Sequence, residues 1–222
     1  MSDPLGREVK VIRRSTPVSL FPTFVWMAEL EDDARERIHR GAMEWLEEMT
    51  DALRELAPGG SWQSEHVLHQ VGQFAELVSV IRRMSAAVLE FLRIGYDGID
   101  ITGCWVNVSA PGAQHVVHHH PNNFLSGVYY VRVGAGSNTI QFHDPRPQVR
   151  VIRPPVRELT GENADMAVVQ VDPGTLLLFP SWLEHSVPPN QGLETRISIS
   201  FNLMFTSYVE TMSLPAWDPG YR

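Results

Sequence analysis

The stretch QHVVHHHPNNFLSGVYYVRV, residues 114–133, joins three consecutive histidines to an apolar run that is typical of a buried β-strand. On a strand, residues i and i+2 point to the same face, so His118 and His120 would lie side by side while His119 faces away. Neutral imidazole is the commonest metal ligand among side chains. The stretch therefore predicts a strand whose entrance carries a pair of candidate metal ligands.

A second stretch supplies a third histidine. His185 follows an apolar strand through a short turn in LLLFPSWLEHSVPP, residues 176–189. In a closed sheet, strand ends that are distant in sequence meet at the mouth of the barrel. We therefore expect His118, His120 and His185 to converge on one metal ion, in the manner of a non-haem iron site.

Arg196 begins a third informative stretch, TRISISFN. Strand alternation places Arg196 and Ser198 on one face and isoleucine side chains on the other. An arginine inside a barrel needs an anionic partner, because an unpaired buried charge is costly. The partner is either a structural carboxylate or, as we prefer, the carboxylate of a ligand, which the guanidinium fork binds with two parallel hydrogen bonds.

The rest of the chain indicates an α+β fold. Apolar residues at helical spacing predict helices over 31–57 and 65–94, and short strands are expected before residue 29. After Gly95, seven or eight short apolar or alternating runs, separated by turn residues, predict a jelly roll, that is, a double-stranded β-helix. These runs are IDITGCWVNVSA, FLSGVYYVRV, SNTIQFHD, VRVIRPPV, MAVVQV, GTLLLFPS and RISISFNLMF. We expect one domain over 1–222, with packing strands and helices over 1–95, the jelly-roll core over 96–206 and a surface tail over 207–222.

Composition narrows the setting. The 222 residues are 43% apolar and 20% charged, which suits a folded chain, and the net charge of −8 gives no support for binding nucleic acid. We expect no membrane span, since no apolar run is long enough. The single cysteine, Cys104, and a start without an apolar signal core predict a cytoplasmic protein.

Four stretches together resemble a family of 2-oxoglutarate- and Fe(II)-dependent oxygenases that is related to the prolyl-hydroxylase-like group. They are HHHPNNFLSGVYYV, TIQFHDPRP, DPGTLLLFPSWLEHSVPPN and TRISISFN. The resemblance implies a double-stranded β-helix that holds one Fe(II), with 2-oxoglutarate and O2 as co-substrates. It also implies that Arg196 and Ser198 grip the distal carboxylate of 2-oxoglutarate, and that Tyr130 reaches the same carboxylate. Asn107, on a strand that leads toward the site, is either a further co-substrate contact or a satisfied core amide.

One position departs from the wider superfamily, whose members mostly carry an acid where this chain has His120. A three-histidine triad is the interpretation we prefer. Asp144 could instead supply the acid, or two histidines could leave a coordination position open, as in halogenases. A register slip of one residue would bring His119 or His115 into the site instead.

The expected reaction is hydroxylation of an unactivated C–H bond in an amino acid, peptide or small natural product, with release of succinate and CO2. Desaturation, cyclisation or halogenation would need only a differently placed substrate. Two other classes compete: a three-histidine cupin-type dioxygenase without a keto acid, and a non-catalytic metal-binding jelly roll. His66 and His69 are expected at the surface. Trp182 either shields the metal or packs in the core. The exposed faces of the two helices could pair two chains as a homodimer.

Overall fold

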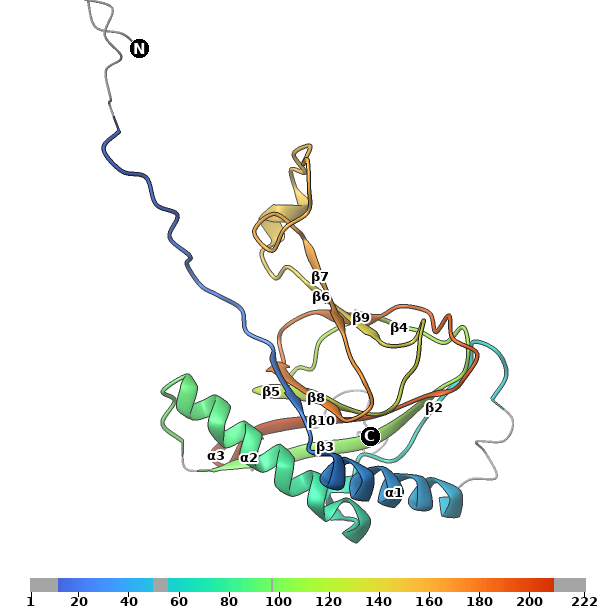
Figure 1. Cartoon of the computed structure of the whole chain (residues 1–222). Helices are drawn as coiled ribbons and strands as arrows, with labels where there is room; N and C mark the ends of the chain where they lie inside the picture. The colour runs from blue at the N-terminus through green and yellow to red at the C-terminus, as the bar shows by residue number, and fades with distance from the viewer. Residues whose placement is uncertain (1–11, 50–55, 97, 210–222) are drawn as a thin grey trace, which may run out of the picture.

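Two antiparallel sheets face each other in the computed structural model, which describes residues 12–49, 56–96 and 98–209 (Figure 1). The larger sheet has the strand order β1 (Trp26–Glu29), β8 (Thr175–Pro180), β5 (Leu125–Arg132), β10 (Arg196–Phe205), β3 (Ile99–Ser109) and β2 (Ser61–Gln63). The smaller sheet has the order β4 (His115–His118), β9 (His185–Val187), β6 (Thr139–His143) and β7 (Met166–Gln170). This arrangement confirms the predicted jelly roll.

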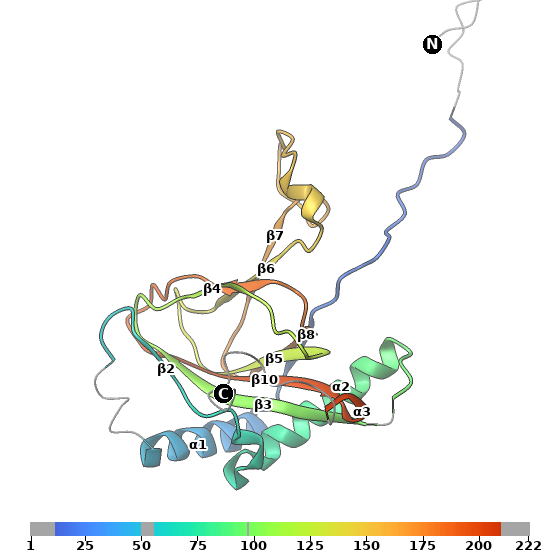
Figure 2. The ribbon, with the colours of Figure 1, turned by 180° about the vertical axis from the view of Figure 1, so that it is seen from behind.

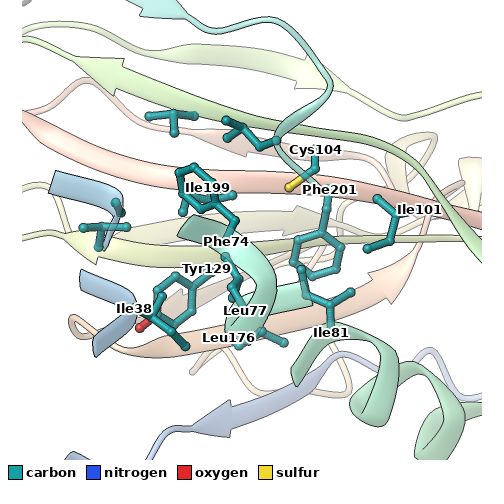
Figure 3. Packing of buried hydrophobic residues seen from close by; sticks show 14 of the residues in the cluster. Ile38, Phe74, Leu77, Ile81, Ile101, Cys104, Tyr129, Leu176, Ile199 and Phe201 are labelled. Carbon is teal, nitrogen blue, oxygen red and sulfur yellow. The ribbon is translucent and has the colours of Figure 1, made fainter. Parts of the chain in front are cut away.

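Two helices cover the outer face of the larger sheet (Figure 2). They are α1 (Asp32–Met49), which begins with Asp32 and Asp33 at the end where acidic residues favour the helix dipole, and α2 (Ala75–Phe91). The core between helices and sheet includes Ile38, Phe74, Leu77, Ile81, Tyr129, Leu176, Ile199 and Phe201 (Figure 3). Burial of these apolar side chains is the main force that holds the helices on the barrel.

Strand alternation divides the central strand between two environments. On β10, Ile197 and Ile199 point into the core beneath the helices, so Arg196 and Ser198 point into the space between the sheets. Gly127 of β5 lies opposite Phe201, and a Cβ atom at this position would collide with the Phe201 ring. The glycine therefore lets β5 and β10 pair beneath a bulky ring.

A second apolar cluster fills one part of the space between the two sheets. Its buried members are Val128, Tyr130, Ile140, Phe142, Val171, Leu177, Phe179 and Leu183. The barrel interior is thus apolar beside β5, β6 and β8. The polar residues described below come mainly from β3, β4, β9 and β10.

Several expected boundaries were wrong. The stretch predicted as a helix from residue 65 forms two short 3-10 turns, η2 (Leu68–Gln70) and η3 (Gly72–Phe74), before α2 begins at Ala75. The run VRVIRPPV is not a strand, because its prolines cannot donate to a ladder; the 3-10 turn η4 (Pro147–Arg150) lies there, in the connection from β6 to β7.

Two expected segments lie partly outside the described residues: the last part of the helix predicted over 31–57, of which residues 50–55 are not described, and the tail over 207–222. Residues 56 and 57 are described and are not helical, so the predicted helix end was wrong. Thr206–Val209 form a short helix, α3, directly after β10. Among the described helices, none combines the length and the apolar character needed to cross a membrane.

Candidate metal centre

Three histidine side chains converge at one end of the smaller sheet. Each of His118, His120 and His185 offers a ring nitrogen, and these three atoms lie within 4.8 Å of one another. His118 and His185 are directly paired across β4 and β9, with ring centroids 4.3 Å apart. The His120 ring centroid lies 5.1 Å from that of His118 and 5.2 Å from that of His185. Spacing of this kind allows three imidazoles to share one ion.

His120 reaches the cluster by a route that simple strand alternation did not predict. β4 ends at His118, and His120 lies beyond the strand, where its backbone N–H donates to the carbonyl of Ser181 at 2.9 Å. Pro121 follows, and a residue that precedes proline is restricted to extended backbone. The side chain is therefore directed by a contact to the β8–β9 turn rather than by the pleat of a strand.

Backbone carbonyls fix the orientation of two of the rings. His118 Nδ1 lies 2.7 Å from the carbonyl oxygen of Val116, and His185 Nδ1 lies 2.9 Å from that of Leu183. A carbonyl can only accept, so each Nδ1 carries the proton and donates it. The Nε2 lone pair of each ring is then free to bind a metal, which is the second-shell arrangement usual for histidine ligands.

The environment keeps two of these imidazoles neutral. Burial and, to a smaller extent, the neighbouring histidines lower the pKa of His120 to about 3. Burial likewise lowers the pKa of His185 to about 4, against the opposing hydrogen bond to Leu183. Neutral imidazole is the form that binds metal, so neither ring must lose a proton at neutral pH before binding.

Arg196 is buried in the barrel, and the described part of the chain offers it no charged partner. Its side chain is 4% exposed, and no carboxylate of a described residue pairs with it. The guanidinium carbon lies 5.3 Å from the centroid of the Tyr130 ring. Within the described part of the chain, Arg196 Nε and the Tyr130 hydroxyl are both buried without a hydrogen-bond partner. Such unsatisfied groups are rare in folded proteins and suggest that a ligand completes them.

The strand register brings the other expected contacts to the same place. Ser198 is paired with Tyr130 on β5 and with Asn107 on β3, so all three side chains share the inner face. Burial lowers the pKa of Arg196 and raises that of Tyr130 to about 12, while the charge of Arg196 partly opposes the shift of Tyr130. At neutral pH the pair thus presents a cation and a protonated phenol.

The Asn107 amide is engaged by protein groups. Its Oδ1 accepts from Gln63 Nε2 at 2.7 Å and from Trp105 Nε1 at 3.1 Å, and its Nδ2 donates to Ser200 Oγ at 2.9 Å. These contacts favour the interpretation of Asn107 as a satisfied core amide that holds β2, β3 and β10 together.

The alternative ligands lie outside the three-histidine group. The carboxylate of Asp144 is held by Arg146, which donates from Nε to Oδ1 at 3.0 Å and from Nη2 to Oδ2 at 2.6 Å. His119 is exposed. His115 lies inside the barrel, but it is not a member of the group of ligand atoms. Trp182 is 54% exposed, so the expectation that it packs in the core was wrong.

A stacked aromatic pair beside the cluster was not anticipated. The rings of His66 and Trp105 stack with centroids 4.4 Å apart, and the Trp105 centroid lies 6.1 Å from that of His120. His66 is exposed, as expected, whereas Trp105 is buried. The stretch before α2 was expected to be helical, so only the fold reveals that His66 lies near the cluster.

Comparison with known proteins agrees with this architecture. Residues 103–202 match the model of a family described as "Putative 2OG-Fe(II) oxygenase". A search of curated proteins found no match.

Solved structures of similar fold include enzymes of this kind. A prolyl-4-hydroxylase from Pseudomonas putida is 16% identical, with a TM-score of 0.55 over 82% of this chain and 93% of its own. SnoN, a non-haem α-ketoglutarate-dependent epimerase from nogalamycin biosynthesis, is 12% identical, with a TM-score of 0.59 over 82% of this chain and 77% of its own. HygX from Streptomyces hygroscopicus, crystallised with nickel, 2-oxoglutarate and hygromycin B, is 13% identical, with a TM-score of 0.56 over 83% of this chain and 84% of its own. At these identities the structures show a shared fold alone.

The family match spans the segment that contains all three clustered histidines and Arg196. These 100 residues, somewhat under half of the chain, are similar to the 2-oxoglutarate- and Fe(II)-dependent oxygenases, and this similarity supports an enzyme of that kind. Fe(II), 2-oxoglutarate and O2 are the metal and co-substrates of such enzymes, and the three-histidine group offers this chain a site for the metal.

Proposed function

We propose that the protein hydroxylates an unactivated C–H bond of a small molecule or peptide, with His118, His120 and His185 as the ligands of Fe(II). The observation that carries the proposal is the presence, in one barrel, of three clustered imidazoles and of a buried guanidinium that has no carboxylate partner among the described residues. The first group suits a divalent metal, and the second suits a dicarboxylate.

The residues present fit the cofactor set of the family. Two of the rings have Nδ1 committed to backbone carbonyls, which leaves Nε2 for the metal. Three neutral donors add no negative charge, so the full charge of a divalent ion remains available to attract a dianionic keto acid. Arg196, buried in the same barrel, supplies a second positive charge.

We assign the distal carboxylate of 2-oxoglutarate to Arg196, Tyr130 and Ser198. The free Nε of Arg196 and the free hydroxyl of Tyr130 are both donors, and a carboxylate offers about four lone-pair positions. Ser198 lies between them in register and adds a hydroxyl. Hydrogen bonds from a charged donor in a dry cavity hold the co-substrate in one orientation.

When bound, Fe(II) would supply the chemistry by which 2-oxoglutarate, O2 and R–H give succinate, CO2 and R–OH. O2 takes up four electrons, two from 2-oxoglutarate and two from the substrate. The chain itself orients the co-substrate between the imidazole cluster and Arg196. The buried apolar cluster around Val128, Phe142 and Phe179 lines the neighbouring part of the barrel interior, and apolar packing of this kind excludes water. The protein thus contributes binding, orientation and exclusion of water.

We assign the outer wall of the substrate site to Trp105 and His66. The pair lies beside His120, and Trp105 Nε1 shares the Asn107 amide oxygen with Gln63 Nε2. An aromatic face with neighbouring amide groups suits an uncharged polar substrate. HygX holds hygromycin B on a similar fold, which supports a small natural product as well as a peptide.

The test is substrate-stimulated succinate release, followed by mass spectrometry of the product. A hydroxylated product carries one added oxygen atom, and in an 18O2 atmosphere that atom is labelled. Release of succinate without a mass change in the substrate would favour isomerisation, the reaction class named for SnoN. Turnover without 2-oxoglutarate would favour a cupin-type dioxygenase, and metal binding without O2 uptake would favour a non-catalytic jelly roll.

We further propose that the protein works in a reducing compartment such as the cytoplasm. Its single cysteine, Cys104, is buried and free. Burial raises the pKa of this thiol to about 12, which keeps it protonated and unreactive.

A further inference from the structure

Regular strand alternation would place His115 and His118 on opposite faces of β4, but a bulge turns both side chains inward. The pairing of β4 with β9 shifts register between His115 and His118. The two intervening residues, Val116 and Val117, are 73% and 49% exposed, so the bulge turns both outward. His115 and His118 consequently both face the interior of the barrel.

The His115 ring lies near the metal-ligand cluster and faces the same interior. Its centroid is 6.5 Å from that of His118, and it is partly buried. It is also within electrostatic range of both Arg196 and His185. An anion bound between the histidine cluster and the guanidinium would therefore lie close to this ring.

Nothing in the described part of the chain uses the hydrogen-bonding capacity of this ring. No described residue forms a hydrogen bond with a His115 ring nitrogen, whereas His118 and His185 each donate to a backbone carbonyl. His115 is also not a member of the group of ligand atoms that could hold the metal. A half-buried imidazole without a protein partner, next to a buried cation, is suited to a bound anion.

We propose that His115 donates a hydrogen bond to the distal carboxylate of 2-oxoglutarate, beside Arg196. The inference rests on the proposed function, because it requires 2-oxoglutarate to lie between the three histidines and Arg196. A carboxylate accepts up to about four hydrogen bonds, so the guanidinium, the Tyr130 hydroxyl and an imidazole N–H can all bind it together. His115 would then be a co-substrate-binding residue rather than a metal ligand.

The test measures keto-acid binding to the Ni(II)-loaded protein by calorimetry, so that no turnover occurs. Two ligands are compared: 2-oxoglutarate and 2-oxopentanoate, which has a methyl group in place of the distal carboxylate. His115→Leu should weaken 2-oxoglutarate binding about 10- to 100-fold, the loss expected for one hydrogen bond to a charged group. It should leave the binding of 2-oxopentanoate and the nickel content unchanged.

Two further variants sharpen the result. His115→Gln keeps an N–H donor on a side chain of similar reach and should recover part of the lost affinity. His119→Leu makes the same kind of change at an exposed neighbouring histidine and should bind 2-oxoglutarate as the wild type does.

Each contrary result has a distinct meaning. Wild-type affinity for 2-oxoglutarate in His115→Leu would overturn the inference and leave the proposed function intact. Equal weakening of both keto acids, or loss of nickel, would assign His115 to the proximal end or to the metal and would also overturn it. Failure of the wild-type protein to bind 2-oxoglutarate would overturn the proposed function and the inference together.

Discussion

Replacement of Arg196 by methionine should change ligand affinity and protein stability in opposite directions. Methionine keeps most of the apolar stem but removes the charge and all the donors. If the guanidinium holds the distal carboxylate with two charge-assisted hydrogen bonds, its loss should cost about 3–5 kcal/mol, which raises the Kd for 2-oxoglutarate roughly 100- to 3,000-fold.

The ligand-free protein should respond differently. Arg196 is 4% exposed, its Nε has no partner among the described residues, and burial lowers its pKa. An unsatisfied buried donor costs about 1–3 kcal/mol, so its removal should stabilise the ligand-free fold by about 1 kcal/mol or more. For a chain of this size, that gain corresponds to a rise in Tm of about 2–4 °C per kcal/mol.

Two assays decide the matter. Calorimetry on the Ni(II)-loaded protein gives the Kd for 2-oxoglutarate, and thermal unfolding without ligand gives the Tm. Arg196→Lys is the matched control, since it keeps the charge but loses the fork. It should bind with intermediate affinity. The reasoning would be refuted if Arg196→Met bound 2-oxoglutarate within threefold of the wild type, or if its ligand-free Tm fell sharply, because the arginine would then be a structural residue with a partner.

Three other changes test separate parts of the structure. His185→Ala should reduce Ni(II) affinity on the order of 100-fold or more, measured by equilibrium dialysis, whereas His119→Ala should bind as the wild type does. The free energy of unfolding of the metal-free protein should fall as the pH decreases from 6.5 toward about 4, since His185 stays neutral in the fold while the unfolded chain takes up the proton. This residue accounts for roughly 3 kcal/mol of that loss. Denaturation curves of His185→Gln, measured at neutral and at acidic pH, should therefore show a smaller loss of unfolding free energy than those of the wild type. An equal loss in the two proteins would contradict the assigned burial. Gly127→Ala should lower the free energy of unfolding by about 1–3 kcal/mol, because the new methyl group would collide with the Phe201 ring and the Leu177 carbonyl; an unchanged denaturation midpoint would show that β5 can shift.

The strands that build the site could be predicted because their side chains alternate between two environments. In RISISFN, the alternation of polar and apolar residues was enough to place Arg196 inside the barrel and Ile197 in the core beneath the helices. The histidines were expected at the entrance of the strand FLSGVYYV, but His118 instead ends a separate strand, β4, in the smaller sheet. The convergence of His185 with it followed from the closure of a jelly roll, in which distant strand ends meet.

Contacts that depend on irregular backbone could not be predicted. Alternation alone would not turn His115 and His118 to the same side, since only a bulge allows two residues to face outward between them. His120 left the strand because of Pro121 and the contact to Ser181. The stacking of His66 on Trp105 depends on a segment that was expected to be helical but forms irregular backbone and 3-10 turns, so its position became clear only from the fold.

The most direct measurement is the visible absorption spectrum of the anaerobic protein with Fe(II) and 2-oxoglutarate. We predict a charge-transfer band that requires both additions in the wild-type protein, that is lost in His118→Ala and His185→Ala, and that needs much more 2-oxoglutarate in Arg196→Met. A band that persisted at full intensity without either histidine, or no band in wild-type protein shown to contain one equivalent of Fe(II), would contradict the three-histidine centre proposed for this barrel.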